Sequence, residues 1–173
     1  MNIRAIALSR KDIRNLTMEV RKICGLQNYY YFPIAEFIEW GLGDPNNNFD
    51  YEIVPEREMK NTYGITNTSS NIMKIREDVY EGAVNGIPRH RFTLCHELGH
   101  FLLHQPILVS YARGDIPIYC RPEWQANTFA GELMAPYHLV KNMTPNEISE
   151  RCGMSKTAAN IQFNVYHKYD VWE

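Results

Sequence analysis

The stretch from Arg91 to His104, "RFTLCHELGHFLLH", carries three of the six histidines in the 173-residue chain. His96 and His100 are four positions apart, and Glu97 follows the first of them. Residues four apart on an α-helix lie on one face, about one turn apart. Two imidazoles placed in this way can bind one zinc ion, and a glutamate beside them can reach water bound to that ion. Because zinc lowers the pKa of bound water toward about 7, the spacing predicts a zinc site with Glu97 as general base.

A third ligand has to come from elsewhere, since a catalytic zinc ion usually takes three protein ligands and keeps one position open. His104 is a poor candidate, because ligands at i, i+4 and i+8 of one straight helix are spread over about 12 Å. Glu123 is a better one, because it follows Pro122 at the start of the next expected helix. We expect His104 to support the site or pack against it without binding the ion. Asn127, one turn after Glu123, either supports that carboxylate, which we favour, or faces solvent.

Composition and charge are those of an ordinary globular protein. Hydrophobic residues make up 45% and charged residues 22% of the chain, and the net charge is −2. A core can therefore form without disulfides, and the charge argues against bulk electrostatic binding of nucleic acid. The four cysteines form no Cys-x-x-Cys pair, which argues against a structural zinc knuckle. No segment is typical of a signal peptide or of a membrane span, so we expect a cytoplasmic protein without membrane contact.

The segments around the histidines predict one α+β domain over residues 1–173. Ser9 and Gly25 bound a first helix with Ile13, Leu16, Val20 and Ile23 on one face. The other expected elements are a second helix at 33–42, a polar loop at 43–48, a strand in "FDYEIVPE" (49–56), a hairpin of "NTYGITN" (61–67) and "NIMKIRE" (71–77), helices at 88–104 and 122–134, and two short helices at 144–169. The order is N-terminal helices within 1–45, a small mixed or antiparallel sheet, and then helices.

Two blocks taken together are specific: "RFTLCHELGHFLLH" and, further along, "EWQANTFAGELMAP" (123–136). This pair resembles the ImmA/IrrE family of zinc metallopeptidases, and the similarity extends over roughly Phe49 to Tyr169. The resemblance implies a zincin-like fold of the gluzincin type, with zinc held by His96, His100 and Glu123 and with Glu97 as the base. It also implies that the helical tail, residues 144–170, packs on the domain. Members of the family cleave helix-turn-helix repressors of mobile elements or stress genes, or bind them.

Three functional hypotheses follow. The first is a zinc endopeptidase that cleaves a protein partner, expected to be a helix-turn-helix repressor encoded nearby. Its substrate would add as a strand to an exposed edge of the sheet, and we expect that edge to be the one formed by "NIMKIRE". The second is an antirepressor, or toxin–antitoxin-like partner, that binds the repressor without cutting it; a complete zinc site serves both. The third is direct DNA binding through "EISERCGMSKTAANIQF" (147–163), which resembles a helix-turn-helix. Only Arg151 and Lys156 are nearby cations there, so we do not expect DNA binding.

Overall fold

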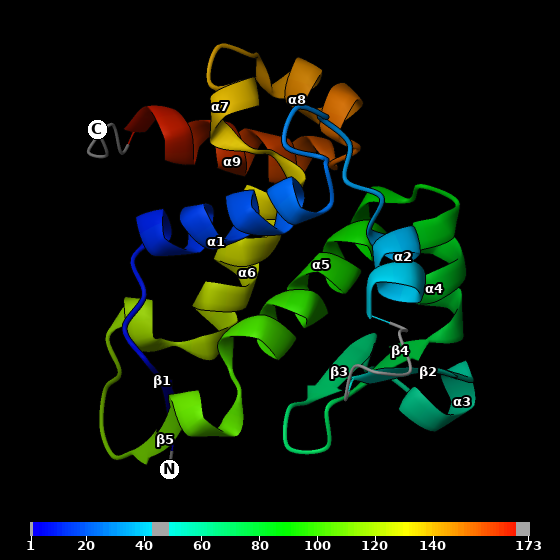
Figure 1. Cartoon of the computed structure of the whole chain (residues 1–173), viewed down its shortest axis with the longest axis vertical. Coiled ribbons are helices and arrows are strands. Elements are labelled where there is room, and N and C mark those ends of the chain that lie inside the picture. Colours follow the sequence, from blue (N-terminus) through cyan, green and yellow to red (C-terminus); the bar gives the residue numbers. More distant parts are fainter. Residues whose placement is uncertain (1, 43–48, 169–173) are drawn as a thin grey trace.

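The computed structural model describes residues 2–42 and 49–168, and Figure 1 shows the arrangement of its elements. Helices fill the upper and central part, and two small sheets lie at the lower end. The described residues form a single α+β domain, as the sequence predicts. The polar loop expected at 43–48 lies outside them. In chain order the elements are β1 (Asn2–Ala5), α1 (Arg10–Ile23), α2 (Ile34–Glu36), a π-helical turn (Phe37–Leu42), β2 (Asp50–Val54), α3 (Glu56–Met59), β3 (Gly64–Asn67), β4 (Ile72–Arg76), α4 (Glu77–Val84), α5 (Pro88–Leu103), a 3₁₀ turn (Pro106–Leu108), β5 (Val109–Ala112), a second 3₁₀ turn (Ile118–Cys120), α6 (Pro122–Met134), α7 (Tyr137–Val140), α8 (Pro145–Cys152) and α9 (Lys156–Lys168).

Helix α1 begins where its cap predicts, and the predicted apolar face is confirmed in part: Ile13 is buried, and Leu16 and Val20 pack against the core. The Ser9 side chain accepts a hydrogen bond from the Asp12 backbone N–H, and the Asp12 carboxylate accepts one from the Ser9 N–H. The buried residues are Ile13, Thr17 and Arg21, whereas Ile23 is 84% exposed. Apolar spacing could not indicate that Thr17 and Arg21 are buried, because both are polar. The guanidinium of Arg21 is stabilised by backbone carbonyl oxygens of Leu26, Tyr29, Tyr30 and Leu133.

The three-stranded sheet has the order β2-β4-β3. Strand β4 pairs with β3 antiparallel, which confirms the expected hairpin, and with β2 parallel. Asn71 adopts a φ of 55° in the turn of the hairpin, a conformation that asparagine tolerates better than most residues. The segment "NIMKIRE" therefore forms the central strand, and its backbone is paired on both sides. Among the described strands of this sheet, β2 and β3 are the edges that could accept a further strand.

A second sheet, which the sequence does not predict, joins β1 to β5. The strands are antiparallel, with Asn2 opposite Ala112 and Ala5 opposite Val109. Each strand has only four residues, and most of β1 is exposed, so it lacks the alternation that marks a half-buried strand. The pairing brings β1 against the segment between α5 and α6, beside the helices that carry the candidate site.

The tail contributes to the same core as the helices before it. Ile148, Cys152 and Ala159 are fully buried in the main hydrophobic cluster. The buried Arg91, at the start of the histidine stretch, donates to the carbonyl oxygens of Phe32 and Cys152. One side chain thus links α5 to the N-terminal loop and to the end of α8. Within the described residues, no helix combines the length and the hydropathy needed to cross a membrane.

Candidate active site

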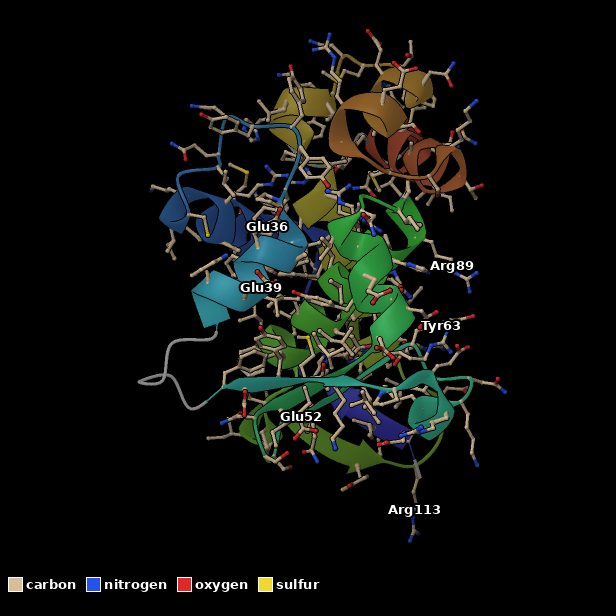
Figure 2. The ribbon with its side chains drawn as sticks, turned by 90° about the vertical axis from the view of Figure 1, so that its right-hand side faces the viewer. Glu36, Glu39, Glu52, Tyr63, Arg89 and Arg113 are labelled. Carbon is tan, nitrogen blue, oxygen red and sulfur yellow. The ribbon has the colours of Figure 1, made fainter. Side chains whose placement is uncertain are left out.

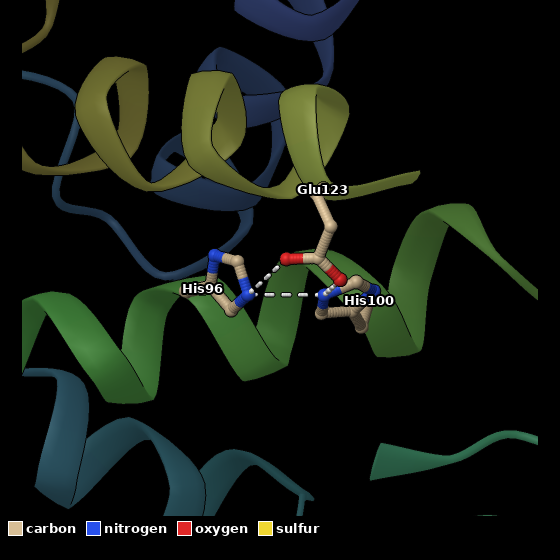
Figure 3. Close-up of side chains that lie close together, drawn as sticks. All are labelled: His96, His100 and Glu123. Atoms are coloured by element: carbon tan, nitrogen blue, oxygen red, sulfur yellow. Dashed lines mark hydrogen bonds and ion pairs between the residues drawn. The ribbon is translucent and has the colours of Figure 1, made fainter. Parts of the chain in front are cut away.

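Helix α5 presents His96 and His100 on one face, and Glu123 points toward them from the first turn of α6 (Figure 3). His96 Nε2 lies 3.0 Å from His100 Nε2 and 3.5 Å from Glu123 Oε2. His100 Nε2 lies 3.3 Å from Glu123 Oε1. A tetrahedral zinc ion with bonds of about 2.0–2.1 Å separates its ligand atoms by about 3.3 Å. The three side chains therefore have the donor types and the spacing to hold one such ion.

Gly99 explains how α6 comes close enough for Glu123 to reach the histidines. A Cβ atom at this position would lie 3.2 Å from the Ala126 Cα and 3.1 Å from a ring carbon of Phe129. Both distances are tighter than ordinary van der Waals contact, and the Ala126 atom belongs to the backbone of α6. A side chain at position 99 would therefore push α6 away from α5 and would carry Glu123 with it.

His104 does not join the three. Helix α5 ends at Leu103, and His104 turns back so that its Nδ1 lies 2.9 Å from the Nδ1 of His100. Its Nε2 lies 3.0 Å from Gln125 Oε1. The amide nitrogen of Gln125 donates to the carbonyl oxygens of Ile6 and Tyr119, at 2.7 Å each. Because that nitrogen is committed to two carbonyls, Gln125 Oε1 can only accept, and His104 must carry its proton on Nε2.

This chain of hydrogen bonds determines the tautomer of His100. A neutral His104 that donates from Nε2 has a lone pair on Nδ1, so His100 donates to it from its own Nδ1. The Nε2 of His100 is then unprotonated and faces Glu123. Burial lowers the pKa of His100 to about 3 and also lowers the pKa of His104, so both rings are neutral at physiological pH.

Asn127 holds the other ring. Its Oδ1 lies 3.0 Å from His96 Nδ1, which donates the hydrogen bond. The sequence suggested that Asn127 supports the Glu123 carboxylate; in the structure its partner is His96 instead. Both histidines thus direct an unprotonated Nε2 into the same space, 3.0 Å apart. Two lone pairs at that distance repel each other unless a cation lies between them. This arrangement of the two Nε2 atoms is the strongest sign of a metal site here.

Glu97 follows His96 on α5, about 100° further round the helix axis. Its side chain is buried, with only 7% of the residue exposed. Its Oε2 accepts a hydrogen bond from the Thr66 hydroxyl at 2.8 Å. A Cβ atom on Gly64 would lie 2.7 Å from Glu97 Cγ, so glycine is what lets β3 pack against the glutamate. Burial raises the pKa of Glu97, while the Thr66 hydrogen bond and the nearby His96 lower it in part. A cavity of about 360 Å³ lies between β3 and these side chains.

Sequence reasoning missed four residues that shape this site: Gly64, Thr66, Gly99 and Gln125. Thr66 and Gly64 belong to a strand that is brought to α5 only by the fold. Gln125, in the first half of α6, is fully buried, and a buried glutamine needs partners for both ends of its amide.

Comparison with known protein families agrees with this geometry. The sequence profile described as the IrrE N-terminal-like domain, Peptidase_M78, matches residues 62–163. The matched segment begins just before β3, includes α5 and α6, and extends into α9. No match was found among curated proteins. Since the profile covers more than half of the chain and includes all the side chains that meet at the cavity, the chain belongs to the IrrE N-terminal-like domain family and is a metallopeptidase that acts on protein.

Proposed function

We propose that this protein is a cytoplasmic, zinc-dependent endopeptidase that cleaves a helix-turn-helix transcriptional repressor. The observation that carries the proposal is the approach of the His96 and His100 Nε2 atoms to 3.0 Å, with a carboxylate within 3.5 Å and a buried glutamate beside them. His96, His100 and Glu123 would hold the zinc ion. When bound, zinc supplies a Lewis acid that polarises a peptide carbonyl and lowers the pKa of water.

Glu97 is the catalytic base in this proposal. Its carboxylate takes a proton from the attacking water and passes the proton to the leaving amine. Thr66 orients the carboxylate through its hydroxyl hydrogen bond, and burial raises the pKa of Glu97 toward the range in which it can both accept and release a proton. General acid–base catalysis of this kind contributes about 10²–10⁴-fold in rate.

Strand β3 provides the surface for the substrate backbone. It is an edge strand of the described sheet, it borders the cavity with Gly64, Ile65 and Thr66, and Ile65 is 53% exposed. An extended polypeptide can add to such an edge through main-chain hydrogen bonds. This corrects the choice of "NIMKIRE", because β4 is the central strand and β3 is the edge next to Glu97.

The resemblance to ImmA/IrrE peptidases supports a repressor as the partner, and co-expression with the repressor encoded nearest to this gene tests it. The parent protein should convert the repressor into two fragments. Zinc-loaded Glu97→Gln should fold and bind the repressor, while cleavage falls at least about 100-fold. Glu52→Gln is the matched control, because Glu52 is an exposed glutamate on β2, paired with Lys74 and outside the cavity (Figure 2).

The same experiment separates cleavage from binding alone. If the parent and Glu97→Gln relieve repression equally and no fragment appears, the protein is an antirepressor and the proposed function is wrong. If neither binds the repressor, the partner is a different protein.

A further inference from the structure

A groove beside the cavity is lined by apolar side chains from three helices. Phe92 comes from α5, Trp124 from α6, and Met154, Ala158 and Ile161 from α9 and the turn before it. The groove consists of two hollows, of about 500 Å³ and about 300 Å³, which share Phe92, Met154, Ala158 and Ile161. They are therefore neighbouring parts of one feature, called here the α9 groove.

The α9 groove adjoins the metal-binding residues. Asn127, which accepts the hydrogen bond from His96, lines the groove, and Trp124 follows Glu123. On α5, Phe92 precedes His96 by four residues, which places it on the same face about 6 Å along the helix. Extended polypeptide advances about 3.3 Å per residue. A substrate side chain about two residues from the cleaved bond therefore reaches Phe92.

The start of β3 lies at the same end of α5 as the groove. Arg89, in the first turn of α5, donates to the Tyr63 hydroxyl at 2.9 Å, and its guanidinium lies over the Tyr63 ring (Figure 2). Tyr63 immediately precedes β3, and Arg89 lines the groove. A polypeptide that pairs with β3 thus runs from the cavity toward the groove.

The chemistry of the walls selects an apolar occupant. Among the described residues, the charged side chains that line the groove are Arg10 and Arg89, and no acidic side chain lines it. Ile161 is 59% exposed although it forms part of the wall. A leucine-sized side chain would cover this isoleucine and the ring of Phe92, whereas a lysine or arginine would meet only like charge.

We propose that the α9 groove is the specificity subsite of the peptidase: it binds a large apolar side chain, such as leucine, isoleucine, methionine or phenylalanine, two or three residues from the cleaved bond. The proposal rests on the proposed function and deepens it, because it names the substrate class as polypeptide with an apolar anchor at that distance.

Methyl NMR of ¹³C-methionine-labelled protein tests the subsite directly. Met154 lines both hollows and Met134 lines one, while Met73 lies in the core outside the groove and serves as reference. The probes are two capped pentapeptides, Ala-Ala-X-Ala-Ala, with X either leucine or its near-isostere asparagine. They are titrated into the Glu97→Gln background, which prevents hydrolysis, with and without zinc. The leucine peptide should shift Met154 and Met134, and it should bind about tenfold more tightly than the asparagine peptide, a difference of about 1.4 kcal/mol.

Two surface variants make the test specific. Ile161→Glu places a carboxylate in the groove and should abolish the preference for leucine. Val84→Glu is the matched control, since Val84 is 55% exposed on α4 and does not line the groove, and it should keep the preference. Both positions are exposed, so neither change should unfold the protein.

Several results would overturn the proposal: no shift of Met154 and Met134 with the leucine peptide, equal binding of both peptides, or the same loss in both variants. Shifts that depend on protein concentration alone would make a second copy of the chain the occupant, and would also overturn it. Failure of the proposed function gives a different result from failure of the subsite proposal. If the leucine peptide occupies the groove but the parent cleaves no protein, the subsite stands as a peptide-binding surface and the peptidase activity does not.

Discussion

Replacing His104 with phenylalanine should weaken zinc binding without touching a ligand. Phenylalanine keeps the ring that packs beside Gln125, but it removes the hydrogen bonds to His100 Nδ1 and to Gln125 Oε1. The Nδ1–H of His100 then loses the acceptor that holds its ring. Loss of such an outer partner costs about 10–100-fold in metal affinity, or about 1.4–2.7 kcal/mol. The orphaned amide oxygen of Gln125 should also lower the free energy of unfolding of the metal-free protein by about 1–3 kcal/mol.

The two effects need separate assays. Titration with a competing chelator gives the zinc affinity, and urea denaturation of metal-free protein gives the stability. His138→Phe is the control: His138 contacts the carbonyl oxygen of Gln27, outside the cavity, and its loss should leave zinc affinity unchanged. If His104→Phe binds zinc within threefold of the parent, the hydrogen-bond chain from Gln125 does not position His100, and the tautomer reasoning is wrong.

Three further predictions concern the metal ligand, the pH dependence and the tail. Glu123→Ala should lower zinc affinity by more than the 10–100-fold expected for an outer partner; a chelator titration that gives the parent value would remove Glu123 from the site. In the metal-free protein, burial lowers the pKa of His100 from 6.5 to about 3. As the pH falls, this imidazole is therefore protonated in the unfolded chain before it is protonated in the folded protein. Stability is then complete above about pH 6.5 and falls as the pH drops toward 3, by about 2 kcal/mol at pH 5, with His104 adding in the same direction. Urea denaturation at pH 7.5 and pH 5 measures the loss, and His100→Gln should reduce it; an unchanged loss in that variant would contradict the assignment. Deleting residues from Thr144 onward removes the buried Ile148, Cys152 and Ala159 from the core and should lower the melting temperature or prevent folding; a truncated chain that melts like the parent would make the tail an independent module.

The helices that carry the site could be predicted because their signals are local. The starts of α5 and α6 follow from Pro88 and Pro122 at their first positions. The separation of His96 and His100 by four residues predicts a shared face from helix geometry alone. Glu123 was a candidate because of its position at a helix start, and α6 does bring it to the two histidines.

What the sequence could not provide depends on long-range packing. Thr66 meets Glu97 across 31 positions, and Gln125 meets Ile6 across 119. The predicted partner of Asn127, the Glu123 carboxylate, was wrong because the partner depends on how α5 and α6 pack. From Glu123 to Asn127 helix α6 advances one turn away from His100 and toward His96, because the two helices run in opposite directions (Figure 3). That direction cannot be read from either helix alone.

Anomalous diffraction at the zinc absorption edge tests the metal site most directly. Crystals of the protein grown with zinc at neutral pH should give one strong peak, about 2.0–2.2 Å from His96 Nε2, His100 Nε2 and a Glu123 carboxylate oxygen. Crystals of Glu97→Gln should give the same peak, because Glu97 is not a ligand in this account. A peak at another set of side chains, or none between α5 and the first turn of α6, would contradict the site on which the proposed chemistry depends.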